Sequence, residues 1–328
     1  MTVLVTGAAG FIGFHVARAL LARGTAVIGV DTLNDYYDPA LKRARLAGLD
    51  QNRDFVFYRR DVAGREAMFD LMARHPEIED IVHLAAQAGV RYSLEDPWAY
   101  VDSNVHGQLT VMEAARRLPR LRHLVYASSS SVYGGNTKLP FAVSDPVDHP
   151  VSAYAATKRA AELLAESHAH LYRLPMTGLR FFTVYGPYGR PDMAYFLFTK
   201  AILAGEPIKV FNAGEMRRDF TYIDDIVAGV LAALDRPPED PGPAHGRPHA
   251  LYNLGNNRSE DLMHFIKVIE AACGQEAVKD MQAMQPGDVA ATYADIDATR
   301  RDLGFDPVTP IEAGVPRFVA WFRDYYGV

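Results

Sequence analysis

Short apolar runs alternate with longer amphipathic stretches from residue 3 to residue 182. Continuous apolar runs are typical of strands that are buried on both faces of a parallel sheet. The stretches between them repeat apolar residues at helical spacing, which predicts helices. Strict alternation of strand and helix predicts an α/β fold with a doubly wound, Rossmann-type parallel sheet. The predicted strands are 3–5, 26–30, 55–58, 81–84, 123–126 and 176–182, and the predicted helices include 15–23, 100–117 and 150–172.

The pattern is looser after residue 190. We expect helices near 195–204, 259–272 and 310–325, and a short strand at 208–211. Another apolar run, at 251–254, predicts a late strand that returns to the sheet. The sequence thus predicts a smaller mixed α/β C-terminal substrate-binding lobe over 183–328, from which segments such as 219–255 return to the first domain.

Three glycines, Gly7, Gly10 and Gly13, stand between the first strand and the first helix. Glycines at this crossover permit a tight turn and bring the backbone close to a pyrophosphate at the positive end of the helix. The second strand ends at Asp31, whose carboxylate can accept hydrogen bonds from both ribose hydroxyls and would repel a 2′-phosphate. The spacing is G-x-x-G-x-x-G rather than G-x-G-x-x-G. Residues 1–182 are therefore predicted to form a Rossmann domain that binds NAD in preference to NADP.

Further cofactor contacts are expected in the glycine turn and at the ends of later strands. Small residues after the fourth strand would let a cofactor lie close to the backbone, and residues after the third would meet the adenine. Asn104, inside a predicted helix, is assigned a structural or cofactor-side role. The additional predicted cofactor residues are Phe11, Ile12, Asp61, Val62, Leu84, Ala85, Ala86, Gln87 and Asn104.

Tyr154 and Lys158 are four residues apart, which places both side chains on one face of a helix. A free phenol has a pKa near ~10 and is a poor base at neutral pH. A neighbouring ammonium favours the phenolate, so the pair would form an acid and base poised near neutrality. A serine run at 128–131 ends the fifth strand, where open α/β sheets place their ligands. The spacing alone is also that of an ordinary solvated helix face.

Six segments together resemble the extended short-chain dehydrogenase/reductases over essentially the whole chain. They are TGAAGFIG at 6–13, Asp31, SSSSVYG at 128–134, YAATK at 154–158, FFTVYGP at 181–187 and RDFTYIDD at 218–225. Within that family the chain is most similar to the NAD-dependent UDP-glucuronate 4-epimerases. The segments that carry this closer likeness are NDYYDPALK at 34–42, SSSSVYGGN at 128–136, TVYGPYGRPDMA at 183–194 and MQPGDV at 284–289.

The resemblance implies a set of roles. Tyr154 would be the catalytic acid and base, Lys158 would anchor the nicotinamide ribose and lower the phenol's pKa, and Ser129 would be the catalytic hydroxyl. Arg218 would bind the diphosphate and Asp288 the uridine ribose. The segment 207–211 would hold the uracil. The substrate residues implied in full are Ser129, Ser130, Ser131, Thr183, Arg190, Val210, Arg218 and Asp288.

The implied reaction is the 4-epimerisation of UDP-glucuronate to UDP-galacturonate by transient oxidation at C4, rotation of the 4-keto sugar and re-reduction. Dehydration is disfavoured because relatives that dehydrate carry Asp-Glu where this chain has Ser130 and Ser131. A UDP-hexose 4-epimerase, a UDP-glucuronate decarboxylase, an NAD-dependent sugar dehydrogenase and a non-catalytic NAD sensor remain alternatives. Arg190, or less strongly Arg91, would clamp the uronate carboxylate through a bidentate contact.

Composition excludes other classes of protein. The net charge of -6 and the absence of a basic run argue against nucleic-acid binding. The chain has 1 cysteine, Cys273, so we expect no internal disulfide and no metal site. No run reaches the ~18 apolar residues of a membrane span and the first residues lack the layout of a secretory leader, so a cytoplasmic location is expected. The helices at 100–117 and 153–172 are expected to pair across a two-fold axis in a homodimer, forming a four-helix bundle.

Overall fold

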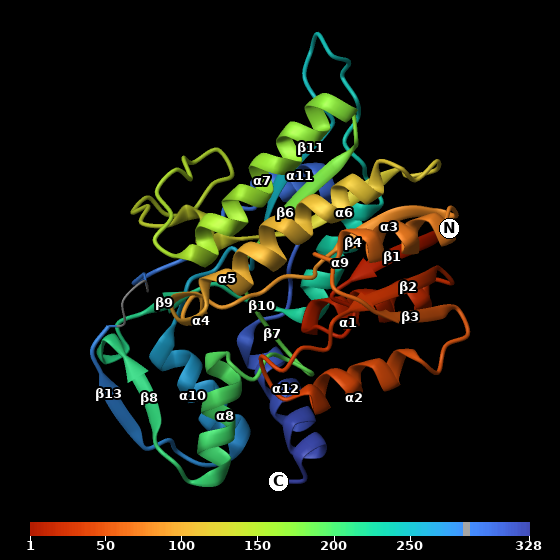
Figure 1. Cartoon of the computed structure of the whole chain (residues 1–328). Coiled ribbons are helices and arrows are strands. Elements are labelled where there is room, and N and C mark those ends of the chain that lie inside the picture. Colours follow the sequence, from red (N-terminus) through yellow and green to blue (C-terminus); the bar gives the residue numbers. More distant parts are fainter. Residues whose placement is uncertain (285–288) are drawn as a thin grey trace.

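The computed structural model describes residues 1–284 and 289–328. Its centre is a seven-stranded sheet in the order β11-β6-β5-β4-β1-β2-β3, and every neighbouring pair is parallel (Figure 1). The chain starts in the middle and the strand order reverses between β1 and β4, which opens a crevice at the carboxyl ends of these strands. The strands are β1 (Thr2–Thr6), β2 (Ala26–Asp31), β3 (Phe55–Arg59), β4 (Ile78–His83), β5 (His123–Ser129), β6 (Met176–Phe181) and β11 (His249–Leu254).

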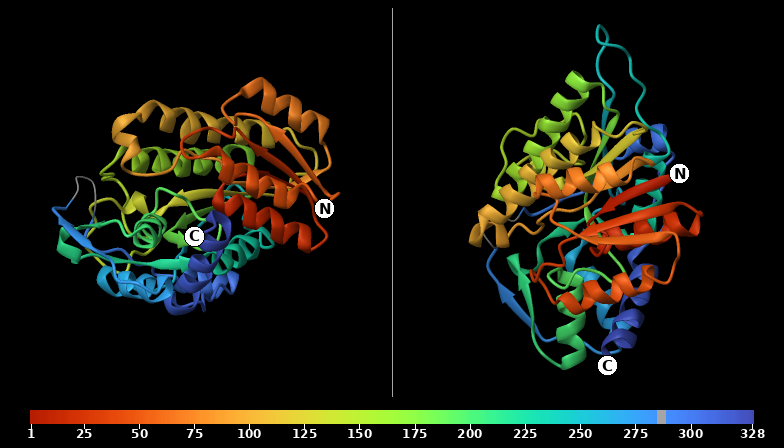
Figure 2. Two further views of the ribbon diagram at one scale, coloured as in Figure 1. Left: turned by 90° about the horizontal axis from the view of Figure 1, so that it is seen from below. Right: turned by 45° about the vertical axis from the view of Figure 1, so that its right-hand side comes forward.

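Helices cover both faces of this sheet, as the alternation of strand and helix predicted (Figure 2). Alternate residues of β1 explain why: Val3 and Val5 pack with α1 and α9 on one face, and Leu4 packs with α3 and α6 on the other. Because both faces are buried, these strands are apolar throughout. The helices around the sheet are α1 (Phe11–Ala22), α2 (Pro39–Leu49), α3 (Arg65–Arg74), α6 (Gly107–Ala115), α7 (Ala153–Tyr172), α9 (Ile223–Leu234) and α11 (Asp297–Leu303).

The helix predicted at 100–117 is present, but it begins earlier, at residue 97, and contains a π-helical turn. A four-residue helix α4 (Tyr92–Glu95) precedes α5 (Pro97–Tyr100), which begins at a proline and is capped by the Asp96 carboxylate. A π-helical turn, η1 (Val101–His106), then leads into α6. Single π-helical turns widen the backbone and are frequent near functional sites. Here the wide turn carries the buried Asn104.

The remaining elements form a smaller lobe below the carboxyl edge of the sheet (Figure 1). Three two-stranded pairs, β7–β10 and β8–β13 (both parallel) and β9–β12 (antiparallel), lie among its helices. The apolar run at 251–254 does return to the large sheet, because β11 pairs with β6. The elements of the lobe are β7 (Thr183–Tyr185), α8 (Ala194–Ala204), β8 (Ile208–Phe211), η3 (Asn212–Gly214), β9 (Arg217–Arg218), β10 (Phe220–Tyr222), β12 (Glu260–Asp261), α10 (Leu262–Cys273), β13 (Lys279–Gln282) and α12 (Ile311–Tyr326).

Cys273 is buried at the end of α10, as expected for a small apolar core residue. None of the helices in the described parts of the chain combines the length and the apolar character that a membrane crossing requires.

Candidate functional site

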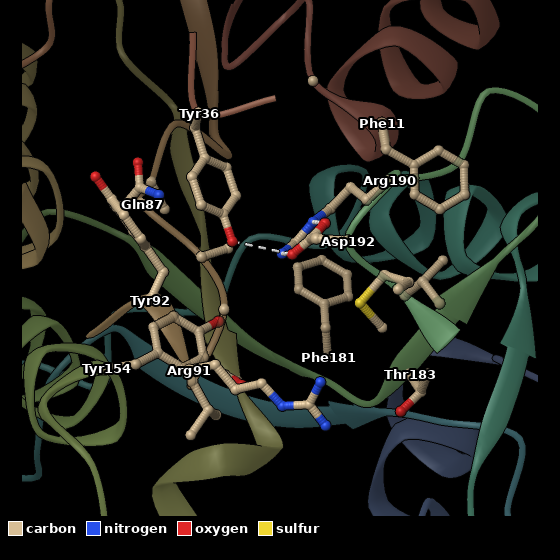
Figure 3. A pocket seen from close by; sticks show the side chains of 18 of the residues that line it. Phe11, Tyr36, Gln87, Arg91, Tyr92, Tyr154, Phe181, Thr183, Arg190 and Asp192 are labelled. Atoms are coloured by element: carbon tan, nitrogen blue, oxygen red, sulfur yellow. Dashed lines mark hydrogen bonds and ion pairs between the residues drawn. The ribbon is translucent and has the colours of Figure 1, made fainter. Parts of the chain in front are cut away.

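A cavity of about 1020 Å³ lies at the carboxyl ends of the central strands, between the sheet and the smaller lobe (Figure 3). Its lining comes from the loops after β1, β2, β3, β4, β5 and β6 and from α7, α8 and β8. This is where the fold places ligands in open α/β sheets. Nearly all of the residues predicted from the sequence to bind cofactor or substrate meet in this one cavity.

The glycine turn forms one end of the cavity. Gly7 has a φ of +72°, which side-chain-bearing residues rarely adopt, and a Cβ there would lie 2.8 Å from the amide nitrogen of Ala85. A Cβ on Gly13 would lie 2.0 Å from the carbonyl oxygen of Gly7, so helix α1 can pack on the turn only without a side chain. Residues 10–13 at the start of α1 line the cavity, and the helix dipole favours an anion there.

Asp31 lines the cavity beside the glycine turn. Its carboxylate accepts hydrogen bonds from the backbone N–H of Ala9 (3.1 Å) and of Leu33 (2.9 Å), which holds it at the end of β2. The side-chain amide nitrogen of Gln87 is buried in the cavity wall and lacks a hydrogen-bond partner among the described residues. A glycine cradle, a fixed acid and an unsatisfied donor fit a dinucleotide that brings its own acceptors.

The predicted cofactor residues lie around this end of the cavity with one exception. Those in the lining are Gly7, Gly10, Phe11, Ile12, Gly13, Asp31, Asp61, Val62, Leu84, Ala85, Ala86, Gln87, Tyr154 and Lys158. Asn104 is outside it. Its side chain bonds the backbone N–H and C=O of Gln87 (both 2.9 Å) and the hydroxyl of Thr157 (3.1 Å). These bonds hold the loop that carries Gln87 in place. They support the structural role proposed for Asn104 rather than a direct contact with the cofactor.

Tyr154, Lys158 and Ser129 converge at the middle of the cavity. The Ser152 hydroxyl caps α7 by accepting from the N–H of Ala155 (3.1 Å), which places Tyr154 in the first turn of the helix. One turn later, Lys158 Nζ donates to the carbonyl of Ala127 (2.9 Å) at the end of β5. Ser129 ends the same strand and lines the cavity with Ser130 and Ser131.

The electrostatics of this group differ from the sequence-based expectation. Burial raises the pKa of Tyr154, while the hydrogen bond from Ser129 and the charge of Arg190 lower it. Burial also lowers the pKa of Lys158 to about 8, against the opposing charge of Glu162. The charge that lowers the pKa of the Tyr154 phenol is that of Arg190 rather than that of Lys158, whose ammonium is turned toward Ala127.

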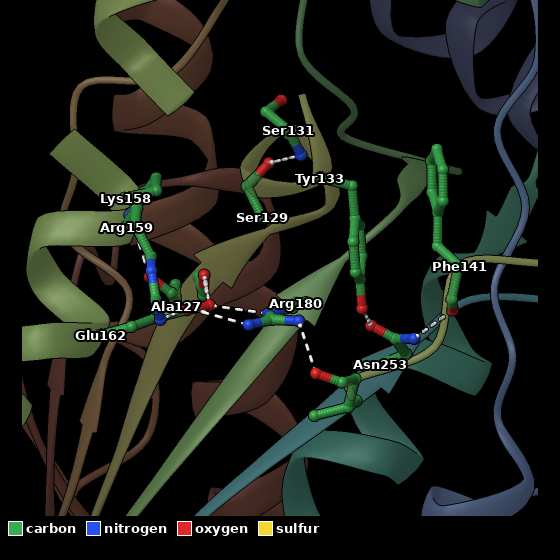
Figure 4. Close-up of polar contacts among 12 residues, drawn as sticks. Ala127, Ser129, Ser131, Tyr133, Phe141, Lys158, Arg159, Glu162, Arg180 and Asn253 are labelled. Atoms are coloured by element: carbon green, nitrogen blue, oxygen red, sulfur yellow. Dashed lines mark hydrogen bonds and ion pairs between the residues drawn. The ribbon is translucent and has the colours of Figure 1, made fainter. Parts of the chain in front are cut away.

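A buried ion pair between Arg180 and Glu162 lies next to the catalytic candidates and holds their elements together (Figure 4). Arg180 on β6 donates to both carboxylate oxygens of Glu162 on α7, at 2.8 Å and 2.9 Å. The Ser128 hydroxyl donates to the same carboxylate at 2.6 Å. The pair therefore ties α7 to the ends of β5 and β6, immediately beside Lys158 and Ser129. Sequence reasoning missed it, because nothing in the local pattern relates position 162 to position 180.

The predicted substrate residues lie toward the smaller lobe. Thr183 and Arg218 line the cavity, and Arg218 Nη1 donates to the carbonyls of Arg217 (2.9 Å) and Ala290 (3.1 Å). The Val210 side chain is buried in the core and is not part of the lining, whereas Ile208, Lys209 and Phe211 of the same strand are. Asp288 lies outside the described residues.

Arg190 lies in the cavity wall and is bonded to a residue that sequence reasoning overlooked. Its Nε and Nη2 donate to the two carboxylate oxygens of Asp192, at 3.0 Å and 2.5 Å. Tyr36, another overlooked residue, donates its hydroxyl to the same carboxylate at 3.1 Å (Figure 3). Both overlooked residues belong to segments that carried the family resemblance, NDYYDPALK and TVYGPYGRPDMA. Their position in these segments was the one sequence signal that could have identified them as site residues.

The loop before Arg190 is held by a fully buried guanidinium. Arg45 on α2 donates to the carbonyls of Ala9 (2.8 Å) and Tyr188 (2.7 Å) and to the hydroxyl of Tyr37 (2.7 Å). A buried charge is costly unless it is hydrogen-bonded, so these contacts are needed together. Arg45 thus ties the glycine turn to the loop that carries Arg190.

Comparison with known proteins agrees with this geometry. Residues 3–255 match the model of the NAD dependent epimerase/dehydratase family. The chain is similar to UDP-glucuronate 4-epimerase 4 of Arabidopsis thaliana (47% identical, covering 99% of this chain and 76% of that one). It is also similar to a probable UDP-glucuronate 4-epimerase of Rhizobium meliloti strain 1021 (45% identical, 99% and 98%). Among solved structures, the UDP-glucuronic acid 4-epimerase of Bacillus cereus in complex with UDP-glucuronic acid and NAD matches with a TM-score of 0.89 (33% identical, 99% and 100%).

Proposed function

The chain belongs to the NAD-dependent epimerase/dehydratase family, and we propose that it is an enzyme that interconverts UDP-glucuronate and UDP-galacturonate at C4. One observation carries this proposal. The half-buried Tyr154 side chain lies with Ser129 and Lys158 in the same cavity as the glycine turn and the predicted uronate-binding hydroxyls. Similar proteins named as UDP-glucuronate 4-epimerases, and a similar solved structure that holds UDP-glucuronic acid and NAD, support the choice of substrate.

The chain's own groups would move the proton. Tyr154, as phenolate, takes the proton of the sugar 4-hydroxyl, and Ser129 hydrogen-bonds the same oxygen as charge develops on it. Lys158, with its lowered pKa, holds the nicotinamide ribose beside the phenol. Bound NAD would supply reversible hydride transfer at C4. Between the two transfers the 4-keto sugar turns about its link to the diphosphate, and Tyr154 then returns the proton.

We propose that the dinucleotide occupies the end of the cavity formed by the glycine turn. The Asp31 carboxylate, held by the N–H groups of Ala9 and Leu33, would accept hydrogen bonds from the adenosine ribose through its remaining lone pairs. Gln87 would direct its unsatisfied amide donor at the cofactor. The fixed negative charge of Asp31 favours NAD over NADP because a 2′-phosphate would be repelled. Residues 1–182 would thus be the NAD-binding domain, and 183–328 mainly the UDP-sugar lobe.

The sugar would lie between Ser129 and Thr183. Ser130, Ser131 and Thr183 present hydroxyl donors to the C5 carboxylate, while Arg190 presents positive charge. No carboxyl group stands at Ser130 or Ser131, so the acid and base needed for loss of the 6-hydroxyl are missing there. Arg218 would bind the diphosphate, the backbone around Val210 the uracil and Asp288 the uridine ribose.

The protein would form a homodimer with two-fold symmetry. Apolar residues that are exposed on the outer faces of η1, α6 and α7 lie at helical spacing, which is typical of a helix-packing surface. They include Val101, Leu109 and Leu163, with exposed fractions of 45%, 37% and 52%. We propose that two copies pair these helices into a four-helix bundle. Light scattering should report twice the mass of 36.3 kDa, and a Leu163→Glu variant should report one copy.

A cytoplasmic location accompanies this proposal. The single cysteine is buried, so the fold needs no disulfide and suits a reducing compartment. Cell fractionation with an antibody to the chain tests the location directly.

The activity is tested by incubating the purified protein with UDP-glucuronate without added cofactor. We expect UDP-galacturonate, since an enzyme that regenerates NAD in each cycle should retain it through purification. Formation of a UDP-pentose with release of CO₂ would identify a decarboxylase, and net reduction of added NAD would identify a dehydrogenase. Turnover of UDP-glucose in preference to UDP-glucuronate would identify a hexose epimerase.

A further inference from the structure

The carboxylate-binding edge of Arg190 is already occupied by a residue of the chain itself. Asp192 accepts from Nε and Nη2 together, which is the bidentate geometry that a uronate carboxylate would use. The two side chains keep 23% and 28% of their surface exposed at the cavity wall, so ligand can reach them. The simple clamp expected from the sequence is therefore incomplete, because Arg190 has a resident anion to compete with the substrate.

Asp192 is itself held in place. The Tyr36 hydroxyl donates to it, and the Tyr36 ring packs against Tyr92 with ring centroids 4.9 Å apart. The chain passes close beneath this group at Gly89, where a Cβ would lie 2.8 Å from the Tyr36 hydroxyl oxygen. A positive φ of 104° also reserves that position for glycine. Loops after β2, β4 and β7 thus meet at one ion pair beside the sugar site.

Epimerisation places an unusual demand on such a contact. The C5 carboxylate is attached to the ring that has to turn between the two hydride transfers, so any bond it makes must be broken in every cycle. An interaction that is strong in the bound substrate and lost during rotation raises the barrier to turnover. An internal carboxylate that replaces the substrate's carboxylate on Arg190 lowers this barrier, because one ion pair forms as the other breaks.

We propose that Asp192 is a resident counter-ion that competes with the uronate carboxylate for Arg190 and so lets the 4-keto sugar leave Arg190 and turn. The proposal rests on the proposed function, since it requires a uronate substrate. Asp192 acts through Arg190 and is thus a positioning residue rather than a catalytic one. Tyr36 supports it by holding the Asp192 carboxylate within exchange distance of the guanidinium.

The test replaces Asp192 with its neutral isostere. Binding is measured by calorimetry in a Tyr154→Phe background, with and without Asp192→Asn, so that turnover does not interfere. We expect UDP-glucuronate to bind about fivefold more tightly when Asp192 is neutral, the factor that corresponds to a partly exposed ion pair of roughly 1 kcal/mol. UDP-glucose is the matched control ligand. It has no carboxylate, and its dissociation constant should stay within about twofold.

The kinetic half of the test uses Asp192→Asn with Tyr154 intact. We expect kcat for UDP-glucuronate to fall by about fivefold or more while KM falls with it, because the carboxylate now stays on Arg190. Tyr36→Phe, which keeps the charge of Asp192 and loses one hydrogen bond, should shift both quantities in the same direction by a smaller factor. If Asp192→Asn does not fold, Tyr36→Phe is used to test the proposal in its place.

Three results would overturn the counter-ion role. They are weaker UDP-glucuronate binding in Asp192→Asn, an equal change for UDP-glucose, and an unchanged or raised kcat. The first would mean that Asp192 serves only to orient Arg190. A wild-type protein that forms no UDP-galacturonate would instead refute the proposed function, so the two failures are distinguishable.

Discussion

Glu162→Gln is the perturbation that best tests how the catalytic group is held. The Glu162 and Arg180 side chains are 1% and 2% exposed, and the guanidinium donates twice to the carboxylate. Removal of the charge from one partner leaves a buried cation without its counter-charge. Breaking a buried pair in this way typically costs about 3–5 kcal/mol. With an unfolding entropy of about 2.1 cal/mol/K per residue over 328 residues, we expect Tm to fall by roughly 4–7 °C.

The catalytic consequence follows from what else the Glu162 carboxylate touches. Ser128, which donates to it, directly precedes Ser129, and Lys158 lies one turn earlier on α7. Loosening this carboxylate should therefore lower kcat by about tenfold even at temperatures where the variant is fully folded. Thermal unfolding followed by circular dichroism, together with initial rates at 15 °C, separates the loss of stability from the loss of positioning.

A matched control pair is available on the surface. Arg300 and Asp306 are 3.0 Å apart, but their side chains are 47% and 64% exposed. Asp306→Asn should change the free energy of unfolding by less than about 1 kcal/mol, since exposed ion pairs contribute little. Equal effects of Glu162→Gln and Asp306→Asn would refute the argument from burial.

Three further predictions concern the cavity itself. Tyr154→Phe should lower kcat by about 10³-fold, the usual worth of a positioned acid and base, while calorimetry still detects UDP-glucuronate binding; a near-normal rate would contradict its role. Gly13→Ala should abolish NAD retention, measured by absorbance of the purified protein, because the new Cβ would lie 2.0 Å from a backbone oxygen. The control variant Gly135→Ala should retain NAD, because its new Cβ would meet nothing closer than 3.8 Å. Lys158 has its pKa lowered to about 8, so kcat should fall as pH rises through 8 and the ammonium is lost, and Lys158→Arg should remove that alkaline limb. The effect of Lys158 on stability has the opposite sign. Between pH 8 and 10.5 this side chain binds fewer protons in the folded protein than in the unfolded chain, so the free energy of unfolding should rise with pH. Denaturant titrations at several pH values would detect this rise.

Local patterns in the sequence were enough for the sheet and for the parts of the site that it carries. Each apolar run became a strand because both faces of the sheet are covered, and the late run at 251–254 joined the same sheet. The glycine turn and the Tyr154–Lys158 pair were predictable for a related reason. Their chemistry depends on the spacing of residues within one segment, and this spacing can be read directly from the sequence.

Contacts between distant segments were not predictable in this way. The Glu162–Arg180 pair, the Asn104–Gln87 bonds and the Arg190–Asp192–Tyr36 cluster join elements whose approach depends on the whole fold. Even the predicted helix at 100–117 departed from the pattern, since hydrophobic periodicity does not reveal the π-helical turn of η1. Local propensity is a weak prior where tertiary packing decides the backbone.

The sequence by itself determined that a tyrosine, a lysine and a serine would lie close to the glycine turn at the edge of a parallel sheet. Only the tertiary structure decided the charges around them. It turned Lys158 toward a backbone carbonyl, brought Arg190 within electrostatic reach of the Tyr154 phenol and set Asp192 on Arg190. The reason is physical: hydrogen-bonding chemistry belongs to each residue, whereas the pKa and the counter-ion of a buried group depend on burial and on neighbours from every element packed around it.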